Sequence, residues 1–326
     1  MTERLLKADL HVHSWHSTEN GDLPFLKSRD CYSDPVDVYR TAKARGMDIV
    51  TITDHDSING CLELLSRMPD VDDFIIGEEV SCRIPDGDIE VHLGVYGMTE
   101  TLHLDIQPLR RNAFEVIGRL REAQVFFSLN HLLHFYRRQV PLDTYLRIVA
   151  EVPALEVRNG TMEPAHNVLV ERLLAYLRHS STGPGGRWPA VTSGSDAHTL
   201  RRVGRTWTEA PGRTAADFLD SLKKGLGQPC GIHGGTHAVA GDAYGVVARY
   251  CASLFGLWPS NHTPLHRAGC IVFSVVSLPG QFLPWMIPAF GKRRERRIVA
   301  DVAAELQPLL DGGAPVTWLA ASEEQA

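Results

Sequence analysis

The sequence predicts a TIM-like α/β barrel followed by a C-terminal extension. Its 326 residues, 44% of them hydrophobic, are enough for one large domain with a substantial core. About seven apolar runs of strand length alternate with helical segments, at intervals of roughly 25 to 35 residues that are typical of such barrels. Histidines and carboxylates recur where the apolar runs end. Because TIM-like barrels place their chemistry at the carboxyl ends of the strands, these residues are the candidate functional groups.

The predicted elements follow one another in a regular order. After a first strand that ends near Asp9, a helix begins at Pro35, because Asp34 can cap it and proline suits its first turn, and Gly46 ends it. The apolar run at 48–54 is typical of a buried strand in a parallel sheet. The remaining predicted strands are 74–82, 90–96, 125–129, 154–157 and 189–192, and the remaining helices are 57–68, 104–123, one that begins at Pro141, and 164–179.

Beyond Gly212 this alternation stops. We expect a helix at 215–224, a glycine-rich segment at 225–241 and another helix at 243–257. We therefore predict two parts. Residues 1–230 form the barrel, and residues 231–326 form a mainly helical extension of unknown role.

One segment of the extension, residues 269–290, is strongly apolar and precedes the basic run Lys292-Arg-Arg-Glu-Arg-Arg297. Its prolines at positions 279, 284 and 288 argue against one straight membrane-spanning helix. We expect residues 269–297 to pack on the barrel or on a partner protein, and peripheral contact with a membrane surface is the alternative.

Charge and cysteine content narrow the classes of protein. The net charge of −6 gives no general attraction to polyanions, so there is no strong nucleic-acid signal. The six cysteines form no Cys-x-x-Cys pair or disulfide-like spacing, and the N-terminus has no apolar signal region. We expect a cytoplasmic protein with free thiols, with a position peripheral to the membrane as the alternative.

The pair His11 and His13 is the first sign of a metal centre. Alternate residues of a strand share a face, so both imidazoles point the same way, and imidazole is a common ligand of first-row metal ions. Six imidazoles and two carboxylates at strand ends are more donors than one ion can bind, which predicts two or three ions. These groups are His11, His13, His55, Glu79, His92, His131, Asp196 and His198.

Residues 5–210 resemble the PHP (polymerase and histidinol phosphatase) family. Four ordered motifs carry the resemblance: Asp9-Leu-His11-Val-His13, Thr53-Asp54-His55-Asp56, Asn130-His131 and Gly194-Ser195-Asp196-Ala197-His198. The family's Glu-Ile-Ser element is matched by Glu79-Val80-Ser81, so its ligand role falls to Glu79 rather than Glu78, and its following histidine is matched by His92. The resemblance implies a distorted (β/α)7 barrel that holds up to three Zn, Mn or Fe ions.

The resemblance also implies roles for single residues. Asp196, His198 and Glu79 are the expected catalytic residues, and Asp54 and Asp56 are expected to support the ligands from behind. Many family members carry aspartate or histidine eight residues after the first histidine; in this sequence that position is Glu19, and His16 could compete with it for the third ion. The expected metal ligands are His11, His13, Glu19, His55, Glu79, His92, His131, Asp196 and His198.

Basic residues and the remaining histidines complete the candidates. Arg158 follows a predicted strand and Arg205 follows the last motif, so both are candidate phosphate-binding residues, although solvated arginines are an equal alternative. We expect the other histidines to be structural. They are His103, His134, His166, His179, His233, His237, His262 and His266.

The predicted function is metal-dependent cleavage of phosphoester bonds by a metal-bridging hydroxide, most simply on small phosphate monoesters. One alternative is a nuclease that acts on nucleotide ends, which would need a basic, aromatic groove. The other is a metal-stabilised regulatory module associated with membrane or polysaccharide glycosyltransferase machinery, because the extension resembles tails of PHP proteins found near glycosyltransferases.

Overall fold

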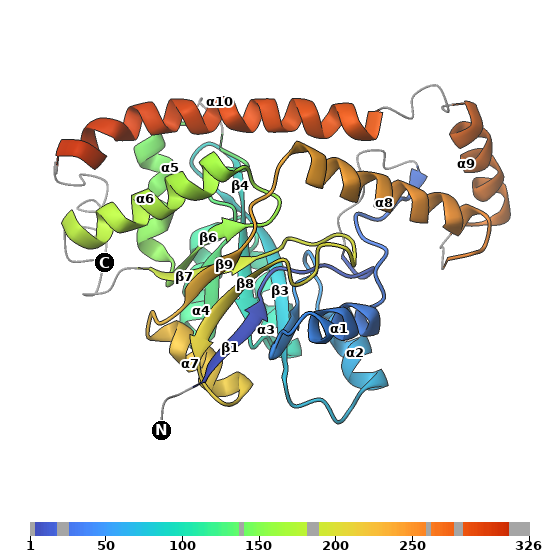
Figure 1. Ribbon diagram of the computed structural model, residues 1–326, viewed down its shortest axis with the longest axis horizontal. Coiled ribbons are helices and arrows are strands. Elements are labelled where there is room, and N and C mark those ends of the chain that lie inside the picture. The colour runs from blue at the N-terminus through green and yellow to red at the C-terminus, as the bar shows by residue number, and fades with distance from the viewer. Residues whose placement is uncertain are drawn as a thin grey trace.

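The computed structural model describes residues 4–17, 26–136, 140–180, 189–258, 262–276 and 283–312. Nine described strands form one sheet in the order β7-β6-β5-β4-β3-β2-β1-β8-β9 (Figure 1). The strands are β1 (Leu5–Asp9), β2 (Ile49–Ile52), β3 (Phe74–Ile84), β4 (Ile89–Tyr96), β5 (Phe126–Leu129), β6 (Ala154–Asn159), β7 (Ala190–Gly194), β8 (Thr206–Pro211) and β9 (Gln228–Gly231).

The sheet curls into a distorted, nearly closed barrel, as the sequence predicted. β1, β2 and β3 run parallel, as do β5, β6 and β7, but β4 runs antiparallel to both of its neighbours. β7, at one end of the sheet, approaches β1 where Val12 pairs with Ala197, just beyond the two strands. Gly194 is required at this closure, because a Cβ there would lie 2.4 Å from the Cβ of His11.

Helices of the barrel lie outside the sheet and match the predicted positions with one exception. The predicted helix at 104–123 is wrong: the chain forms α3, a short 3-10 turn at Gln107–Leu109, and then α4, because Pro108 cannot continue the first helix. The barrel helices are α1 (Pro35–Ala44), α2 (Asn59–Arg67), α3 (Glu100–Ile106), α4 (Ala113–Glu122), α5 (Leu142–Glu151), α6 (Pro164–Ser180) and α7 (Ala215–Lys223).

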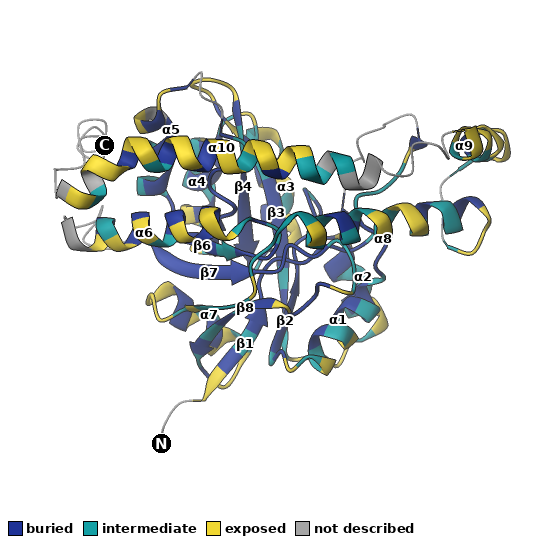
Figure 2. Ribbon diagram, turned by 45° about the horizontal axis from the view of Figure 1, so that its top comes forward, coloured by how far each residue is buried: buried dark blue, intermediate teal, exposed yellow. Residues whose placement is uncertain are grey.

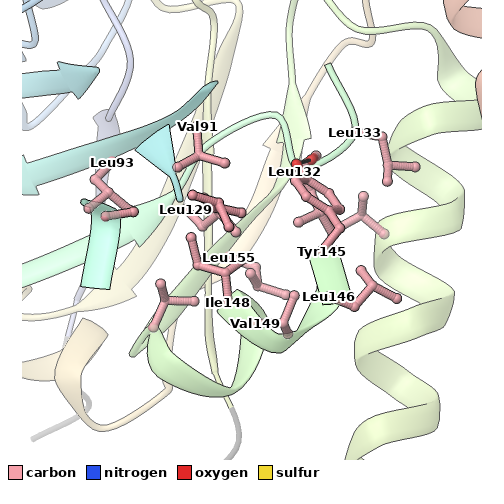
Figure 3. Close-up of a cluster of buried hydrophobic side chains, with 14 of the residues drawn as sticks. Val91, Leu93, Leu129, Leu132, Leu133, Tyr145, Leu146, Ile148, Val149 and Leu155 are labelled. Atoms are coloured by element: carbon pink, nitrogen blue, oxygen red, sulfur yellow. Dashed lines mark hydrogen bonds between the residues drawn. The ribbon is translucent and has the colours of Figure 1, made fainter. Parts of the chain in front are cut away.

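Alternation along the strands separates the hydrophobic core from the site. Figure 3 shows Val91, Leu93, Leu129 and Leu155, from three adjacent strands, packed near Ile148 of α5. Each fully buried leucine stabilises the fold by about 1.5 to 3 kcal/mol relative to an exposed one. Because successive residues of a strand point to opposite faces, neighbours of these residues point into the barrel.

The C-terminal extension is helical, as predicted, with α8 (Thr236–Leu254), α9 (Pro264–Val276) and α10 (Leu283–Gly312). α10 lies along α6 and α8, and Ile298, Val299, Val302 and Leu306 join the main hydrophobic core. α9 stands at one end of the molecule, with much of its surface exposed (Figures 1 and 2). Among the described residues, no helix is both long and apolar enough to cross a membrane.

Two strands that precede the extension were not predicted. β8 and β9 form an antiparallel pair beside β1, in a stretch where no strand was expected. β9 has only four residues, among them a proline and a glycine, so it carries little strand signal.

The division at residue 230 remains a prediction, because nothing in the fold of the described residues separates the two parts.

Candidate metal centre

The donor residues come from different strands but meet at one end of the barrel. His11 and His13 follow β1, His55 follows β2, and His131 follows β5. Glu79 lies within β3, where alternation turns its side chain into the barrel while Val80 joins the core. Asp196 and His198 follow β7. The structure thus brings together every predicted donor that lies among the described residues.

Glu79 stands at the centre of this group, which we call the Glu79 cluster (His11, His13, His55, Glu79, His92, His131 and Asp196). One carboxylate oxygen, Oε2, lies 3.0 Å from His11 Nε2, 3.2 Å from His55 Nδ1 and 3.5 Å from His13 Nε2. The other oxygen, Oε1, lies 3.1 Å from His131 Nε2 and 3.3 Å from His92 Nδ1. The two oxygens therefore face different sets of imidazoles, as a bridging carboxylate would.

Asp196 closes the cluster on the side of β7. Its Oδ1 lies 3.4 Å from His13 Nε2 and 3.6 Å from both His11 Nε2 and His198 Nδ1. The backbone of Asp196 has φ +51° and that of His131 has φ +28°, both in a region that non-glycine residues rarely adopt. Such strain persists where the surrounding structure enforces it, and it aims both side chains at the cluster.

A second group lies at the rim, and we call it the Asp30 cluster (His13, Asp30, His55 and His198). Their ligand atoms all lie within 4.8 Å of one another, and His13 and His55 belong to both clusters. Asp30 Oδ2 is 3.5 Å from His198 Nε2 and 3.8 Å from His55 Nε2. Asp30 is a candidate ligand that the sequence analysis missed, because it lies in a loop without a periodic pattern.

Glu19 and His16 were the two residues that the sequence suggested as ligands of a third ion. Glu19 lies outside the described residues, so its proposed role stays a prediction. His16 does not join either cluster: its Nε2 lies 2.5 Å from Glu63, on α2. Its neighbour Trp15 binds the same carboxylate. Among the described residues, Asp30 is therefore the carboxylate that joins His13, His55 and His198 at the rim.

Two buried polar residues hold the ligands in place. Asn130 stands in the third motif but was given no role from the sequence, and Glu156 was not singled out. Glu156 on β6 accepts a hydrogen bond from the backbone N–H of His131 at 3.0 Å, and lies 2.9 Å from Nδ1 of His11. Asn130 donates from Nδ2 to Glu79 at 2.9 Å. A carboxylate behind a ligating imidazole fixes the ring and leaves the other nitrogen for the metal. An acidic residue inside the otherwise apolar run Ala154-Leu-Glu-Val was the signal for Glu156.

Asp54 and Asp56 lie behind the metal-ligand residues. Their hydrogen-bond partners are backbone N–H groups, a hydroxyl and a guanidinium rather than imidazole rings. The Asp54 carboxylate accepts hydrogen bonds from the backbone and hydroxyl of Ser14, which fixes the loop after His13. Asp56 accepts from the backbone N–H of Ser81 at 2.8 Å and pairs with Arg110 at 2.5 Å. Burial raises the pKa of Asp54 to about 7.

The candidate phosphate-binding arginines lie apart from both clusters. Arg158 turns outward to Glu171 on α6, with its Nη2 2.8 Å from that carboxylate. Arg205 is exposed in the turn before β8. A substrate role for either residue stays a prediction.

The buried carboxylates and imidazoles of the site shift one another's pKa values. Burial opposes ionisation of Glu79, yet the imidazoles of His11, His55 and His92 lower the pKa of its carboxyl well below the ordinary value. Burial likewise disfavours a charged His11, yet Glu79 and Asp196 raise its pKa well above the ordinary value. The buried carboxylates therefore require cations beside them, whether protons on imidazole or metal ions.

The donor atoms fit divalent metal ions. Over the ranges that the structure describes, His11 Nε2, both ring nitrogens of His13, Glu79 Oε2 and Asp30 Oδ1 are buried without a hydrogen bond of good geometry. Buried polar atoms nearly always have a partner, so such a convergent set needs one. Imidazole and carboxylate donors suit Zn, Mn and Fe, and divalent metal binding follows from this set.

Comparisons with known proteins bear on the family and the fold. Residues 190–226 match a family model described as PHP-associated. An uncharacterized protein of Methanocaldococcus jannaschii is 34% identical over 76 residues, which are 23% of this chain and 44% of that protein. The chain thus spans less than half the length of this curated relative.

Solved structures show a similar fold. PsfC from Pseudomonas syringae is 18% identical with a TM-score of 0.51, over 76% of this chain and 99% of that one. A two-domain protein from Bacteroides vulgatus, containing a predicted PHP-like metal-dependent phosphoesterase, is 15% identical with a TM-score of 0.48, over 70% of this chain and 65% of that one.

The barrel and the donors at its strand ends define a candidate centre for divalent metal ions. The chain resembles the PHP family, since the matched segment contains the fourth motif and the other three motifs meet it at one face of the barrel.

Proposed function

We propose that the protein hydrolyses small phosphate monoesters with two or three divalent ions. The observation that carries this proposal is the position of Glu79, whose two oxygens face separate sets of imidazoles. When bound, the ions would activate water and offset charge on the phosphoryl oxygens. Zn, Mn and Fe all suit the donors, so we propose a divalent ion of this class and do not choose among the three metals.

The residues of the chain would divide the work by position. Glu79, fully buried, would hold two ions in a fixed relation, and Asn130 and Glu156 would keep the surrounding ligands in place. Asp196 and His198 would accept and donate protons, because Asp196 Oδ1 and His198 Nδ1 lie 3.6 Å apart at the rim. The His198 side chain is 26% exposed, so this side is the one open to substrate.

A panel of substrates tests the proposal. Metal-loaded protein is assayed against phosphomonoesters, dinucleotides and oligonucleotides, with Glu79→Gln as the inactive control. Turnover of phosphomonoesters that Glu79→Gln abolishes would support the proposal. Preference for oligonucleotides would favour the nuclease alternative, and no turnover by fully metal-loaded protein would favour the regulatory module.

We also propose that a cytoplasmic pool of the protein contacts a membrane or a partner peripherally through residues 269–297. α9 exposes Val272, Val275 and Val276, the last of them 73% exposed. In α10 Lys292 is buried, but the four arginines of the basic run, at positions 293, 294, 296 and 297, are exposed. Apolar and basic groups together suit the surface of an anionic bilayer.

Vesicle flotation tests this contact. Binding to anionic vesicles, released by carbonate and lost when Val275 and Val276 are both changed to aspartate, is expected. The matched control is Leu104→Asp, an exposed apolar residue on the barrel. Equal binding by both variants would contradict a role for α9.

A further inference from the structure

A second group of metal-type donors lies outside the barrel, at the start of α9. His262, His266 and Cys270 offer ligand atoms that all lie within 4.8 Å of one another. Cys270 is only 4% exposed, and both histidines are half-buried. None of the three belongs to the PHP motifs or touches the Glu79 or Asp30 cluster. The sequence analysis expected the two histidines to be structural.

The local sequence explains why these residues meet. Thr263 caps the helix, with Oγ1 3.4 Å from the backbone nitrogen of His266, and Pro264 suits its first turn. His266 and Cys270 are four residues apart, so they lie one turn apart on the same face. His262 precedes the cap and folds back over that face. A single short segment thus supplies all three donors.

The distances approach those of a tetrahedral site. With zinc–nitrogen bonds of about 2.0 to 2.1 Å and zinc–sulfur bonds of about 2.3 Å, tetrahedral geometry separates two nitrogens by about 3.3 Å and nitrogen from sulfur by about 3.6 Å. In this cluster the Nδ1 atoms of His262 and His266 are 3.0 Å apart, and the sulfur of Cys270 is 3.8 Å from the same His266 atom. Small rotamer adjustments would meet the ideal values.

The surroundings shield the sulfur from solvent. The sulfur lies in a small cluster with Tyr32, Tyr250 and Leu254, and the ring of Tyr250 meets that of His262 edge-on at 6.0 Å. This cluster joins α9 to α8. An ion at this position would therefore fix the N-terminal half of α9.

We propose that His262, His266 and Cys270 bind one zinc-class divalent ion, with water in the fourth position. The cysteine binds as thiolate, and its proton passes to solvent. Mixed imidazole and thiolate donors select zinc over magnesium or calcium. The positive end of the α9 dipole opposes a cation, and the negative charge of the thiolate offsets that repulsion.

Cobalt substitution distinguishes this ion from those in the barrel. The full-length protein is stripped of metal and titrated with Co²⁺. Among the donor groups of the described residues, only this one offers sulfur, since the Glu79 and Asp30 clusters contain nitrogen and oxygen donors. A near-ultraviolet sulfur-to-cobalt charge-transfer band that saturates at one equivalent, and is bleached by Zn²⁺, is the expected result.

Two variants and one control complete the experiment. Cys270→Ser should abolish the band, and His266→Gln should weaken binding so that the band appears only at higher cobalt concentration. Cys251→Ser, at a half-buried cysteine on α8, should leave it unchanged. Circular dichroism verifies that each variant is folded. Absence of the band in folded wild-type protein, or its persistence in Cys270→Ser, would overturn the proposal.

Discussion

The Glu79 and Asp30 clusters share His13 and His55 yet differ in how they are built. Glu79 is fully buried and takes its neighbours from strand ends that the barrel holds rigidly. Asp30 comes from a loop, its side chain is 12% exposed, and its partner His198 is 26% exposed. Donors in a buried, rigid frame lose less conformational entropy when they become ordered, and water screens their charges less. One barrel end can thus combine a tightly held pair of ions with a more exchangeable one.

The largest expected effect comes from Glu79→Gln. The change keeps the shape but removes the charge that offsets two dications, so bound metal and phosphomonoesterase rate should both fall to near background. Glu78→Gln is the matched control, because Glu78 points to the other face of β3 and binds His103 at 2.8 Å. Its folding is verified first, since loss of a buried charged hydrogen bond costs about 1.5 to 3 kcal/mol. If Glu78→Gln were the metal-free variant, the assignment within β3 would be wrong.

Asp30→Asn should have the next largest effect. Asp30 faces His198 and His55, so its loss should remove the rim ion and slow turnover while the Glu79 cluster stays loaded. Glu19→Gln is compared with it, because the sequence pointed to Glu19 for the same position. Metal content by elemental analysis decides between them. Loss of an ion from Glu19→Gln alone would contradict the role of Asp30 as a ligand.

Glu156→Gln should have a smaller effect on the Glu79 cluster. Glu156 fixes the ring of His11 and the backbone of His131 without reaching the metal positions, and loss of such support usually lowers metal affinity by about 10- to 100-fold. Competition with a chelator measures the affinity. The control is Glu171→Gln, which removes a carboxylate paired with Arg158 outside the barrel. Unchanged affinity in Glu156→Gln would show that the contact is dispensable.

His166→Gln should affect neither cluster and instead alter stability with pH. Burial lowers the pKa of His166 to about 4, against an ordinary value of 6.5. The unfolded chain therefore binds the proton first, so this histidine's contribution is fully present above pH 6.5 and is lost as pH falls toward 4, by on the order of 3 kcal/mol. Urea unfolding of metal-free protein between these pH values should show a flatter profile for His166→Gln. Identical profiles would contradict the shift.

Most of the fold and the Glu79 cluster could be predicted from the sequence, because strand periodicity and strand-end position are local properties. His11, His55 and Asp196 each follow an apolar run, and the barrel brings such positions together. The antiparallel course of β4 could not be read from its own residues, since an alternating pattern is the same in either direction. The pairing of β8 with β9 was not predicted, because the short segment that forms β9 has no strand pattern.

Asp30 shows why the rest of the site escaped sequence analysis. It lies in a polar loop where neither helical nor strand periodicity exists, and its position depends on contacts with Ser17 and the histidines rather than on neighbours in sequence. The α9 donors were passed over for another reason. His266 and Cys270 show helical spacing, but only the fold places His262 beside them.

Anomalous X-ray diffraction from crystals of the metal-loaded protein tests most directly whether Glu79 bridges two ions. Two strong peaks that share Glu79 are expected, each about 2.0 to 2.2 Å from one of its carboxylate oxygens. A weaker third peak is expected between Asp30 and His198. A single peak at Glu79, or full activity in crystals without any peak there, would contradict the bridging role.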